Sequence, residues 1–259
     1  MTGRERTRLR RPGKTDALAI ARVTARDADL PPARGQGAHE DLKVLVDARE
    51  ELVVARTAEA NRLHADLPIL TPGYARQLPS LAGPAALVRA EALLLDLAGV
   101  RAAVARRRVP RLRSLDRDIA DMTSQIRDAV SACRTSLTTI TGVGPIVAAR
   151  ILGEVGDIRR YPTRDHFAAG NGTAPIPVIS GRTDRHRFNR GGNRRLNRAL
   201  HIVARTQASW DPRAKAYLDK KRLEGKTRAE AMRCLKRRLS DVIYRAMISD
   251  LNQNAAEAA

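Results

Sequence analysis

The segment Leu137–Asp157, LTTITGVGPIVAARILGEVGD, decides how the second half of this chain is expected to fold. Its apolar residues are spaced for two helices around a short hairpin, Gly142-Val143-Gly144, and Pro145 stands where a helix commonly begins. Glycines let such a turn approach a sugar-phosphate backbone, and the free N–H groups of the following helix can then accept a phosphate. The pattern therefore predicts a helix-hairpin-helix contact with nucleic acid through Gly142 and Gly144. A tight turn that binds nothing is the alternative.

A helical arm is predicted ahead of this hairpin, over residues 38–136. One apolar seam alternates steps of three and four residues for about three heptads: Leu112, Leu115, Ile119, Met122, Ile126, Ala129 and Cys133. Two segments can supply its partner helix, His39–Asp66 and Ala85–Arg108, and the second follows Pro84 at a favourable first helical position. A coiled coil that joins two chains, and with it a homo-oligomer, is one interpretation. An intramolecular bundle is equally compatible with so short a seam.

Further helices are expected beyond the hairpin, which makes the fold class mainly α. Thr163 is suited to cap a short helix, and Asn193–Ser209 carries apolar residues at helical spacing. Asp211-Pro212 begins another helix. Thr227–Glu230 reads as a capping box for the last helix, whose tail after Asn252 is expected to fray. The glycine- and proline-rich stretch before residue 181 is expected to be extended or looped.

The charge of the chain indicates a polyanionic partner. Lys and Arg number 48 against 28 Asp and Glu, a net charge of +20 over 259 residues, for which nucleic acid is the default partner. No membrane contact is expected, because no apolar run reaches the roughly 18 residues of a spanning helix. Aromatic residues are only 3% of the chain, which argues against a reader of single strands by base stacking. Cys133 and Cys234 fall in apolar stripes and are expected to be buried thiols of a cytoplasmic, nucleoid-associated bacterial protein.

One serine lies within a strongly basic stretch of the chain, Gly172–Leu200. Ser180 precedes Gly181, and a single acid, Asp184, stands among the arginines that follow, which are Arg182, Arg185, Arg187, Arg190, Arg194, Arg195 and Arg198. Guanidinium groups match phosphate oxygens two at a time and stabilise the charge that builds up when a nucleophile attacks phosphorus. The residue types favour a serine that meets a phosphodiester. An arginine-rich loop that only grips nucleic acid, with Ser180 an ordinary turn residue, is the alternative.

The order of these motifs resembles a known family. GVGPIVAARILGEVGDIRRYPTRDHFAAGNGTAPIPVISG, followed by the basic run through RGGNRRLNRALHIVA, is similar to the C-terminal domain of insertion-sequence transposases of the one-ten and one-sixteen type, also described as bridge-RNA-guided recombinases. The resemblance runs from about Leu137 to Ala246. It implies that Ser180 is the nucleophile that becomes joined to DNA and that Mg²⁺ is the cofactor. It also implies, as partners, double-stranded DNA of the mobile element and its target, and a guide RNA.

Members of that family also carry an N-terminal RuvC-like domain whose four carboxylates, Asp-Glu-Asp-Asp, hold metal. Here GKTDALAIAR matches only the end of that domain: Asp16 is present, but Gly13 stands where the family has another Asp. Asp16 is therefore the one candidate catalytic and metal-binding carboxylate, and it can equally be an acid that favours a helix N-terminus. We expect an N-terminally truncated member, with a remnant over 1–37, the arm over 38–136, a serine domain over 137–251 and a frayed tail over 252–259.

Three functions remain open from the sequence. The first is DNA transposition or recombination, with strand transfer through Ser180 and carboxylates supplied from elsewhere; whether this chain alone is an enzyme stays open. The second is a non-catalytic DNA- or RNA-binding remnant or regulator of such a transposase. The third, a ribosomal or nucleoid packaging protein, rests on charge alone and does not explain a serine where the arginines converge.

Overall fold

The computed structural model describes residues 37–180, 183–187, 189 and 191–257, and five separate positions at 18, 21, 22, 25 and 26. Of residues 177–180 and 183–187 it describes the backbone alone. The chain falls into two units, Met1–Gly35 and Gln36–Ala259. In the first unit the described positions are helical and exposed. Asp16, the candidate metal ligand, lies outside the described residues, as do Arg182 and Arg190.

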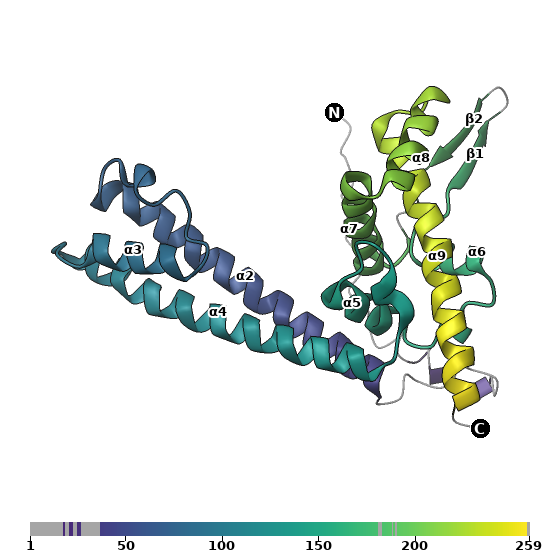
Figure 1. The fold of residues 1–259 in the computed structure, drawn as a ribbon, viewed down its shortest axis with the longest axis horizontal. Helices are drawn as coiled ribbons and strands as arrows, with labels where there is room; N and C mark the ends of the chain where they lie inside the picture. Colours follow the sequence, from purple (N-terminus) through teal and green to yellow (C-terminus); the bar gives the residue numbers. More distant parts are fainter. Residues whose placement is uncertain are drawn as a thin grey trace, which may run out of the picture. The chain divides into compact units, whose positions relative to one another are not determined.

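Two long helices form the arm of the second unit. The helices α2 (Ala38–Leu70) and α4 (Val100–Ala132) have 33 residues each and pack along one another, and α3 (Pro84–Leu94) lies against α4 (Figure 1). A 3₁₀ turn, η1 (Tyr74–Arg76), lies between α2 and α3. We call these four elements the arm; at 1.5 Å per residue each long helix measures about 50 Å. No helix in the described part of the chain is long and apolar enough to cross a membrane.

The seam predicted on α4 packs against α2 of the same chain, so the intramolecular pairing is present. Leu112 and Ile126 are fully buried, while the seam residues between them are half-buried. The other predicted partner, a single helix over Ala85–Arg108, is wrong. The chain breaks at Gly99, whose φ of +95° only glycine adopts without strain. Pro110 sits inside α4, where the packed helix continues despite one lost hydrogen bond.

The arm and the domain that follows it have separate apolar cores, and α2 contributes to both. Its outer half packs in the arm core, which is built from Ala60, Leu63, Leu67, Leu78, Leu81, Leu87, Leu94, Val109 and Leu112, among others. Its first turns, with Leu42 and Val46, enter the second core together with Phe167, Leu200 and Ile243. One continuous helix therefore joins the two cores.

The C-terminal domain, residues 136–257, is a group of helices with two 3₁₀ turns. Its elements are η2 (Ser136–Thr139), α5 (Pro145–Val155), η3 (Ile158–Arg160), α6 (Arg164–Gly170), α7 (Arg194–Trp210), α8 (Pro212–Leu223) and α9 (Arg228–Glu257). The predicted caps are confirmed. Thr163 Oγ1 accepts from the N–H of His166, and Thr227 and Glu230 each accept from the other's backbone N–H. The last helix does not end at Asn252 but continues to Glu257, which pairs with Arg134.

A two-stranded antiparallel hairpin crosses from α6 to α7. Its strands are β1 (Ile176–Ser180) and β2 (Thr183–Arg187), and Ser180 is paired with Thr183 at the turn end. The base of the hairpin is closed, because Asn193 N–H donates to Gly170 O at 2.7 Å. A Cβ at Gly192 would lie 2.3 Å from Gly172 N, so the two chain segments touch through bare backbone. The segment expected to be extended or looped is thus a fixed hairpin at its base.

The helix-hairpin-helix expectation differs from the structure on one side. The segment before Gly142 is the single 3₁₀ turn η2 instead of an α-helix. Asp250 of α9 accepts hydrogen bonds from Thr135 Oγ1 at 2.8 Å and from Ser136 N–H at 2.9 Å, which holds this turn to α9. The β-branched residues that follow disfavour an α-helix. The helix on the other side, α5, begins at Pro145 as predicted.

The root of the arm rests directly on α5. A Cβ at Gly153 would lie 2.9 Å from the N and Cα atoms of Lys43 in α2, closer than Cβ atoms pack. The two helices therefore approach each other at a position without a side chain.

Both cysteines are free thiols, in agreement with the expectation that they form no disulfide. The expectation of buried thiols is met only in part, because Cys133 and Cys234 are half-buried. Partial burial still raises the pKa of the Cys133 thiol, so this sulfur stays protonated at neutral pH.

Candidate nucleic-acid interface

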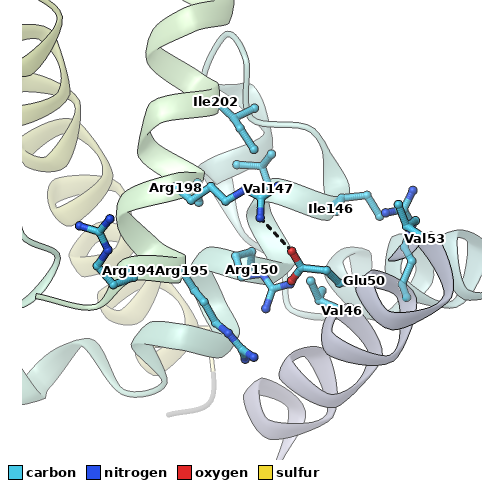
Figure 2. Close-up of a pocket in the computed structure, with 12 residues that line it drawn as sticks. Val46, Glu50, Val53, Ile146, Val147, Arg150, Arg194, Arg195, Arg198 and Ile202 are labelled. Carbon is cyan, nitrogen blue, oxygen red and sulfur yellow. Dashed lines mark hydrogen bonds and ion pairs between the residues drawn. The ribbon is translucent and has the colours of Figure 1, made fainter. Parts of the chain in front are cut away.

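A cleft of about 540 Å³ lies where the arm meets the C-terminal domain, between α2, α5 and α7 (Figure 2). Its apolar lining consists of Val46, Val53, Ile146, Val147, Ala199 and Ile202. Its charged lining consists of Arg49, Glu50, Arg150, Arg194, Arg195 and Arg198. Five guanidinium groups against one carboxylate make this lining suited to an anion that also presents apolar surface.

The first turn of α5 forms one wall of the cleft. Gly144 is its N-cap residue and makes no side-chain capping bond, and Pro145 contributes no N–H. Ile146 and Val147, which follow, line the cleft. The unsatisfied N–H groups and the positive end of the helix dipole favour an anion there. Gly144 is exposed with open space beside it, so a phosphate can approach this position without collision.

Gly142 has a different role from Gly144. Its φ is +88°, and a Cβ there would lie 3.0 Å from Thr206 Cβ and 3.2 Å from Val203 O of α7. The same contact is fixed by Gln207 Nε2, which donates to Thr141 O at 2.8 Å. The predicted hairpin glycine is therefore required for packing against α7, and the side open to a ligand is the one at Gly144.

An ion-pair network connects the arm to the domain across the cleft. Arg150 of α5 donates to Asp47 and, at 2.7 Å, to Glu50 Oε2. From α7, Arg195 donates to Asp47 Oδ2 at 2.6 Å and Arg198 to Glu50 Oε1 at 3.2 Å, the pair drawn in Figure 2. Two arm carboxylates thus stand where the prediction placed phosphate.

The carboxyl group of Asp47 shows how strong the local positive potential is. Burial alone would raise its pKa, but hydrogen bonds from Lys43, Arg150 and Arg195 outweigh burial and lower the pKa to about 2. Asp47 is therefore ionised over the whole physiological range and remains a permanent partner of these cations.

The three arginines in the network differ in exposure, and the difference separates their roles. The side chain of Arg150 is 12% exposed, whereas that of Arg195 is 52% and that of Arg198 is 74% exposed. Arg150 is enclosed by its carboxylate partners and joins the arm to the domain. Exposed ion pairs contribute only about 0–1 kcal/mol, so Arg198 can exchange Glu50 for another anion at little cost.

A buried polar network supports the base of the hairpin behind Arg194. Lys236 Nζ donates to Asn197 Oδ1 at 2.5 Å, Asn197 Nδ2 donates to Asn171 O at 2.8 Å, and Asn171 Nδ2 donates to Ser240 Oγ at 2.7 Å. Burial, and then the charge of Arg194, lower the pKa of Lys236 to about 8. Lys236 is thus a buried cation that is hydrogen-bonded to the amide of Asn197 and adds to the positive charge near Arg194.

The sequence reasoning missed several of these residues, namely Asp47, Glu50, Arg150, Asn171, Asn197 and Lys236. Asp47 and Glu50 stand one helical turn from each other on α2 and interrupt its apolar stripe, which was the available signal. Lys236 sits next to Leu235 in the buried stripe of α9, where a lysine is unusual.

The structure brings some of the predicted site residues together, and for others it describes the backbone alone. Gly142, Gly144, Arg194, Arg195 and Arg198 gather around the arm–domain junction and the hairpin turn beside it. For Ser180, Arg185 and Arg187 the structure describes only the backbone, on β1 and β2. Within the described part of the chain, no group of three or more His, Cys, Asp and Glu side chains is placed to hold a metal ion.

Comparison with known proteins finds a family match within the second half of the chain. Residues 134–219 match the family described as Transposase IS116/IS110/IS902. A 43.6 kDa protein of insertion element IS110 from Streptomyces coelicolor is 40% identical over 116 residues, which is 44% of this chain and 28% of that protein. A 42 kDa protein of insertion element IS900 from Mycobacterium paratuberculosis is 29% identical over 291 residues, 92% of this chain and 72% of that protein.

A third relative agrees with these two. A 44.8 kDa protein of insertion element IS116 from Streptomyces clavuligerus is 32% identical over 142 residues, 54% of this chain and 35% of that protein. In the IS110 and IS116 comparisons the chain thus spans about a third of the relative's length. The matched segment contains α5 and α7, which are two of the three walls of the cleft, and the β1–β2 hairpin that carries Ser180. Residues 134–219 are thus similar to the IS116/IS110/IS902 transposase family, and the three relatives are all proteins of insertion elements.

Proposed function

We propose that this protein acts in the transposition of a bacterial insertion element, binding DNA at the cleft and transferring a strand through Ser180. The observation that carries the proposal is that one family-matched segment, residues 134–219, contains both Ser180 and the α5 and α7 walls of a cleft lined by arginines. Serine and cations therefore belong to the same folded domain. The substrate in this proposal is double-stranded DNA of the element and its target.

The binding step uses the described side chains. A backbone phosphate is accepted by the N–H groups at the start of α5, beside the open space at Gly144. Arg198 and Arg195, which are exposed on α7, supply the charge. In this proposal the contact at the cleft is with the sugar-phosphate backbone, which positions the DNA and carries no sequence information directly.

The chemical step is a transesterification at phosphorus. The Ser180 oxygen forms a bond to phosphorus and the bond from phosphorus to one sugar oxygen breaks; the serine loses its proton and the departing oxygen gains one. The product is a phosphodiester between Ser180 and the DNA end, which a second strand's hydroxyl can attack in reverse. Arginines that surround the phosphate stabilise the negative charge of the transition state.

Mg²⁺ is the cofactor that the family resemblance implies, and the described residues of this chain do not fit it. The carboxylates at the cleft, Asp47 and Glu50, are each engaged by arginines. Asp16, the predicted ligand, lies outside the described residues. No step above is routed through the metal. In the proposal any metal is held by carboxylates beyond the described part of this chain.

The test of catalysis is a covalent adduct. The purified chain is incubated with DNA carrying the element's ends, with and without Mg²⁺, and the mixture is separated under denaturing conditions. We expect an adduct that migrates as protein joined to DNA and that disappears in Ser180→Ala. Ser209→Ala, which removes an exposed hydroxyl on α7, is the matched control and should keep the adduct. If no adduct forms even when an intact family member is added to supply the remaining carboxylates, strand transfer by this chain is ruled out.

The second candidate function is binding without chemistry, as a remnant or regulator of a transposase. It is favoured by the fact that the described cations of the cleft account for binding without any contribution from Ser180. This function predicts DNA affinity that falls steeply with salt, is unchanged in Ser180→Ala, and weakens in Arg198→Gln. Arg113→Gln, which removes an arm cation paired with Glu91, is the matched control and should leave affinity unchanged.

Two further partners belong to the proposal. One is a guide RNA, which competition between element DNA and co-expressed RNA would detect. The other is a second copy of the chain joined through the arm. Because the α4 seam is already covered by α2, such a dimer would use the outer faces of the arm, and light scattering of the purified chain decides its presence.

A further inference from the structure

The helix α8, the turn after it and the first part of α9 carry a large excess of positive charge. Residues 211–238 contain eleven Lys and Arg against four Asp and Glu. This segment is about a tenth of the chain and carries about a third of its net charge of +20. Most of it lies beyond residue 219, where the family match ends. Neither the sequence motifs nor the cleft accounts for it.

The cations here are exposed, and several have no acidic partner. In the described structure Lys215, Lys220, Lys226, Arg228 and Arg238 are exposed and take part in no ion pair. The acids of the segment are each engaged by other cations: Glu224 by Lys221 and Glu230 by Arg233 and by the helix cap at Thr227. The positive charge is therefore left uncompensated toward solvent.

The two helices are held together so that these cations keep a fixed arrangement. The half-buried ring of Tyr217 on α8 has Lys221 at 5.5 Å on its own helix and Arg238 of α9 at 5.3 Å from its centroid. Ala214 and Leu235 join α8 and α9 to the domain core. Between them, Gly225, with φ +81°, closes a tight turn. A rigid pair of basic helices presents charge at fixed spacing, unlike a solvated tail.

We propose that this surface, α8 with the start of α9, is a second site for the phosphate backbone of duplex DNA, separate from the arm–domain cleft. The inference rests on the proposed function, since it takes DNA to be the substrate. Charge complementarity selects the occupant, because a phosphodiester backbone is the polyanion that a DNA transposase meets. The surface and the β1–β2 hairpin lie toward the same end of α9 in Figure 1, so a duplex held here extends toward the hairpin.

The contact is sequence-independent. Tyr217 is the one aromatic side chain in residues 211–238, and its ring is occupied by Lys221 and Arg238, so no ring is free to stack on a base. Three of the five exposed cations without an ion pair are lysines, which bind phosphate as a point charge and do not read base edges in a fork. The surface therefore sets how firmly and in what direction DNA is held.

The experiment compares two triple variants of the full chain that remove the same charge. Lys215→Gln/Lys220→Gln/Arg228→Gln neutralises the surface, and Arg107→Gln/Arg117→Gln/Arg127→Gln neutralises exposed, unpaired arginines of α4. Affinity for a duplex DNA is measured over a range of salt. For the surface variant we expect the slope of log affinity against log salt to fall by about 2–3, at about 0.9 per lost phosphate contact, and affinity at low salt to fall at least about tenfold. The arm variant should keep the slope of the parent.

Each other outcome is decisive. An unchanged slope in the surface variant overturns the proposal, because the surface would then contact no phosphates. An equal loss of affinity in both variants also overturns it, because only the net charge of the chain would then matter. Loss of affinity for an RNA duplex of the same length, with DNA affinity retained, overturns it in favour of RNA. The conserved-charge variant Lys215→Arg/Lys220→Arg/Arg228→Lys should restore the slope, which excludes a folding defect. If the surface variant binds DNA like the parent while Arg198→Gln still weakens binding, the second site is excluded and the proposed function is unaffected.

Discussion

Arginine has different roles in the arm and in the C-terminal domain: in the arm it forms structural ion pairs, and in the domain it supplies an excess of positive charge. Residues 38–135 contain 15 Lys and Arg against 13 Asp and Glu, so the arm is nearly neutral. Residues 136–257 contain 24 against 11, and the domain carries a large excess of positive charge. In the arm, the cations nearly equal the acids in number, and several ion pairs join facing helices. In the domain they exceed the acids, and the excess lies at the cleft and on α8 and α9.

The arm shows what an arginine does when it is structural. Arg56 of α2 donates to Asp116 of α4 at 2.8 Å and to Leu81 O at 2.6 Å, so one guanidinium ties three segments of the arm together. Arg108 donates to Glu59 at 2.9 Å across the helix pair. Such arginines satisfy buried acceptors and are unavailable to a ligand. A count of arginines therefore says little until the acids that face them are known.

The largest effect on stability is expected in the two apolar cores that α2 joins. Phe167 is fully buried in the domain core, and Phe167→Ala should lower the free energy of unfolding by about 3–5 kcal/mol. Leu63→Ala in the arm core should cost about 2–5 kcal/mol. Urea unfolding followed by circular dichroism measures both. Because α2 runs through both cores, each variant should show one transition; two separate transitions in either would mean that the arm and the domain fold independently.

A smaller loss of stability is expected when an arm ion pair is broken. Arg108→Gln leaves the nearly buried carboxylate of Glu59 with Arg62, which is 59% exposed, as its remaining salt-bridge partner. Removing one partner of a buried charge costs several kcal/mol, and the remaining partner reduces this to about 1–3 kcal/mol. Thermal unfolding measures the loss, with the exposed Arg107→Gln as the control. DNA affinity should not change, and a fall in affinity would contradict the structural assignment of arm arginines.

The junction between the regions should show an acid-dependent loss of stability. The pKa of Asp47 is lowered to about 2 from an ordinary value of 3.8, so its ion pairs stabilise the folded state above about pH 4, and this stabilisation is lost as pH falls toward 2. The difference, reduced for partial exposure, is about 1–2 kcal/mol. Unfolding free energies between pH 5 and 2 should therefore fall more steeply in the parent than in Asp47→Asn. Parallel curves would show that Asp47 is not held by its arginines.

The smallest effect concerns the exchange of the arm carboxylate for phosphate. Glu50→Gln frees Arg198 from its exposed partner, while Arg150 keeps its second partner, Asp47. An exposed pair such as that of Arg198 contributes at most about 1 kcal/mol, so DNA affinity at low salt should rise by up to about fivefold. Fluorescence anisotropy with labelled duplex measures the change. Glu91→Gln, which frees Arg113 on the arm, is the matched control and should leave affinity as it is. A rise in both variants would mean that only net charge matters.

Much of the helical framework could be predicted from the sequence, because caps and apolar spacing are local. Thr163, Asp211 and the Thr227–Glu230 box mark the starts of α6, α8 and α9, and each cap hydrogen bond is present. The break at Gly99 was missed because the apolar pattern on either side of it continues in phase. The 3₁₀ turn η2 was missed because Asp250, which fixes it, lies more than a hundred residues away along the chain.

The candidate site was predicted only in part, for a related reason. The sequence identifies the arginines at 194, 195 and 198, but not the arm acids that meet them, since Asp47 and Arg195 are far apart in sequence. Of the two hairpin glycines, neighbours in space show that Gly142 serves packing while Gly144 faces open space. For Ser180 the prediction rests on the family resemblance and stays a prediction.

The glycine at the root of the arm has a consequence for how relatives of this chain can vary. Because Lys43 lies directly against Gly153, a larger side chain at position 153 would change the direction in which α2 leaves the domain. Length is under no such restriction. Adding or deleting seven residues in both α2 and α4 would shift the outer end by about 10 Å along a fixed line. The length of the arm can therefore vary among relatives while the direction in which it leaves the domain stays the same.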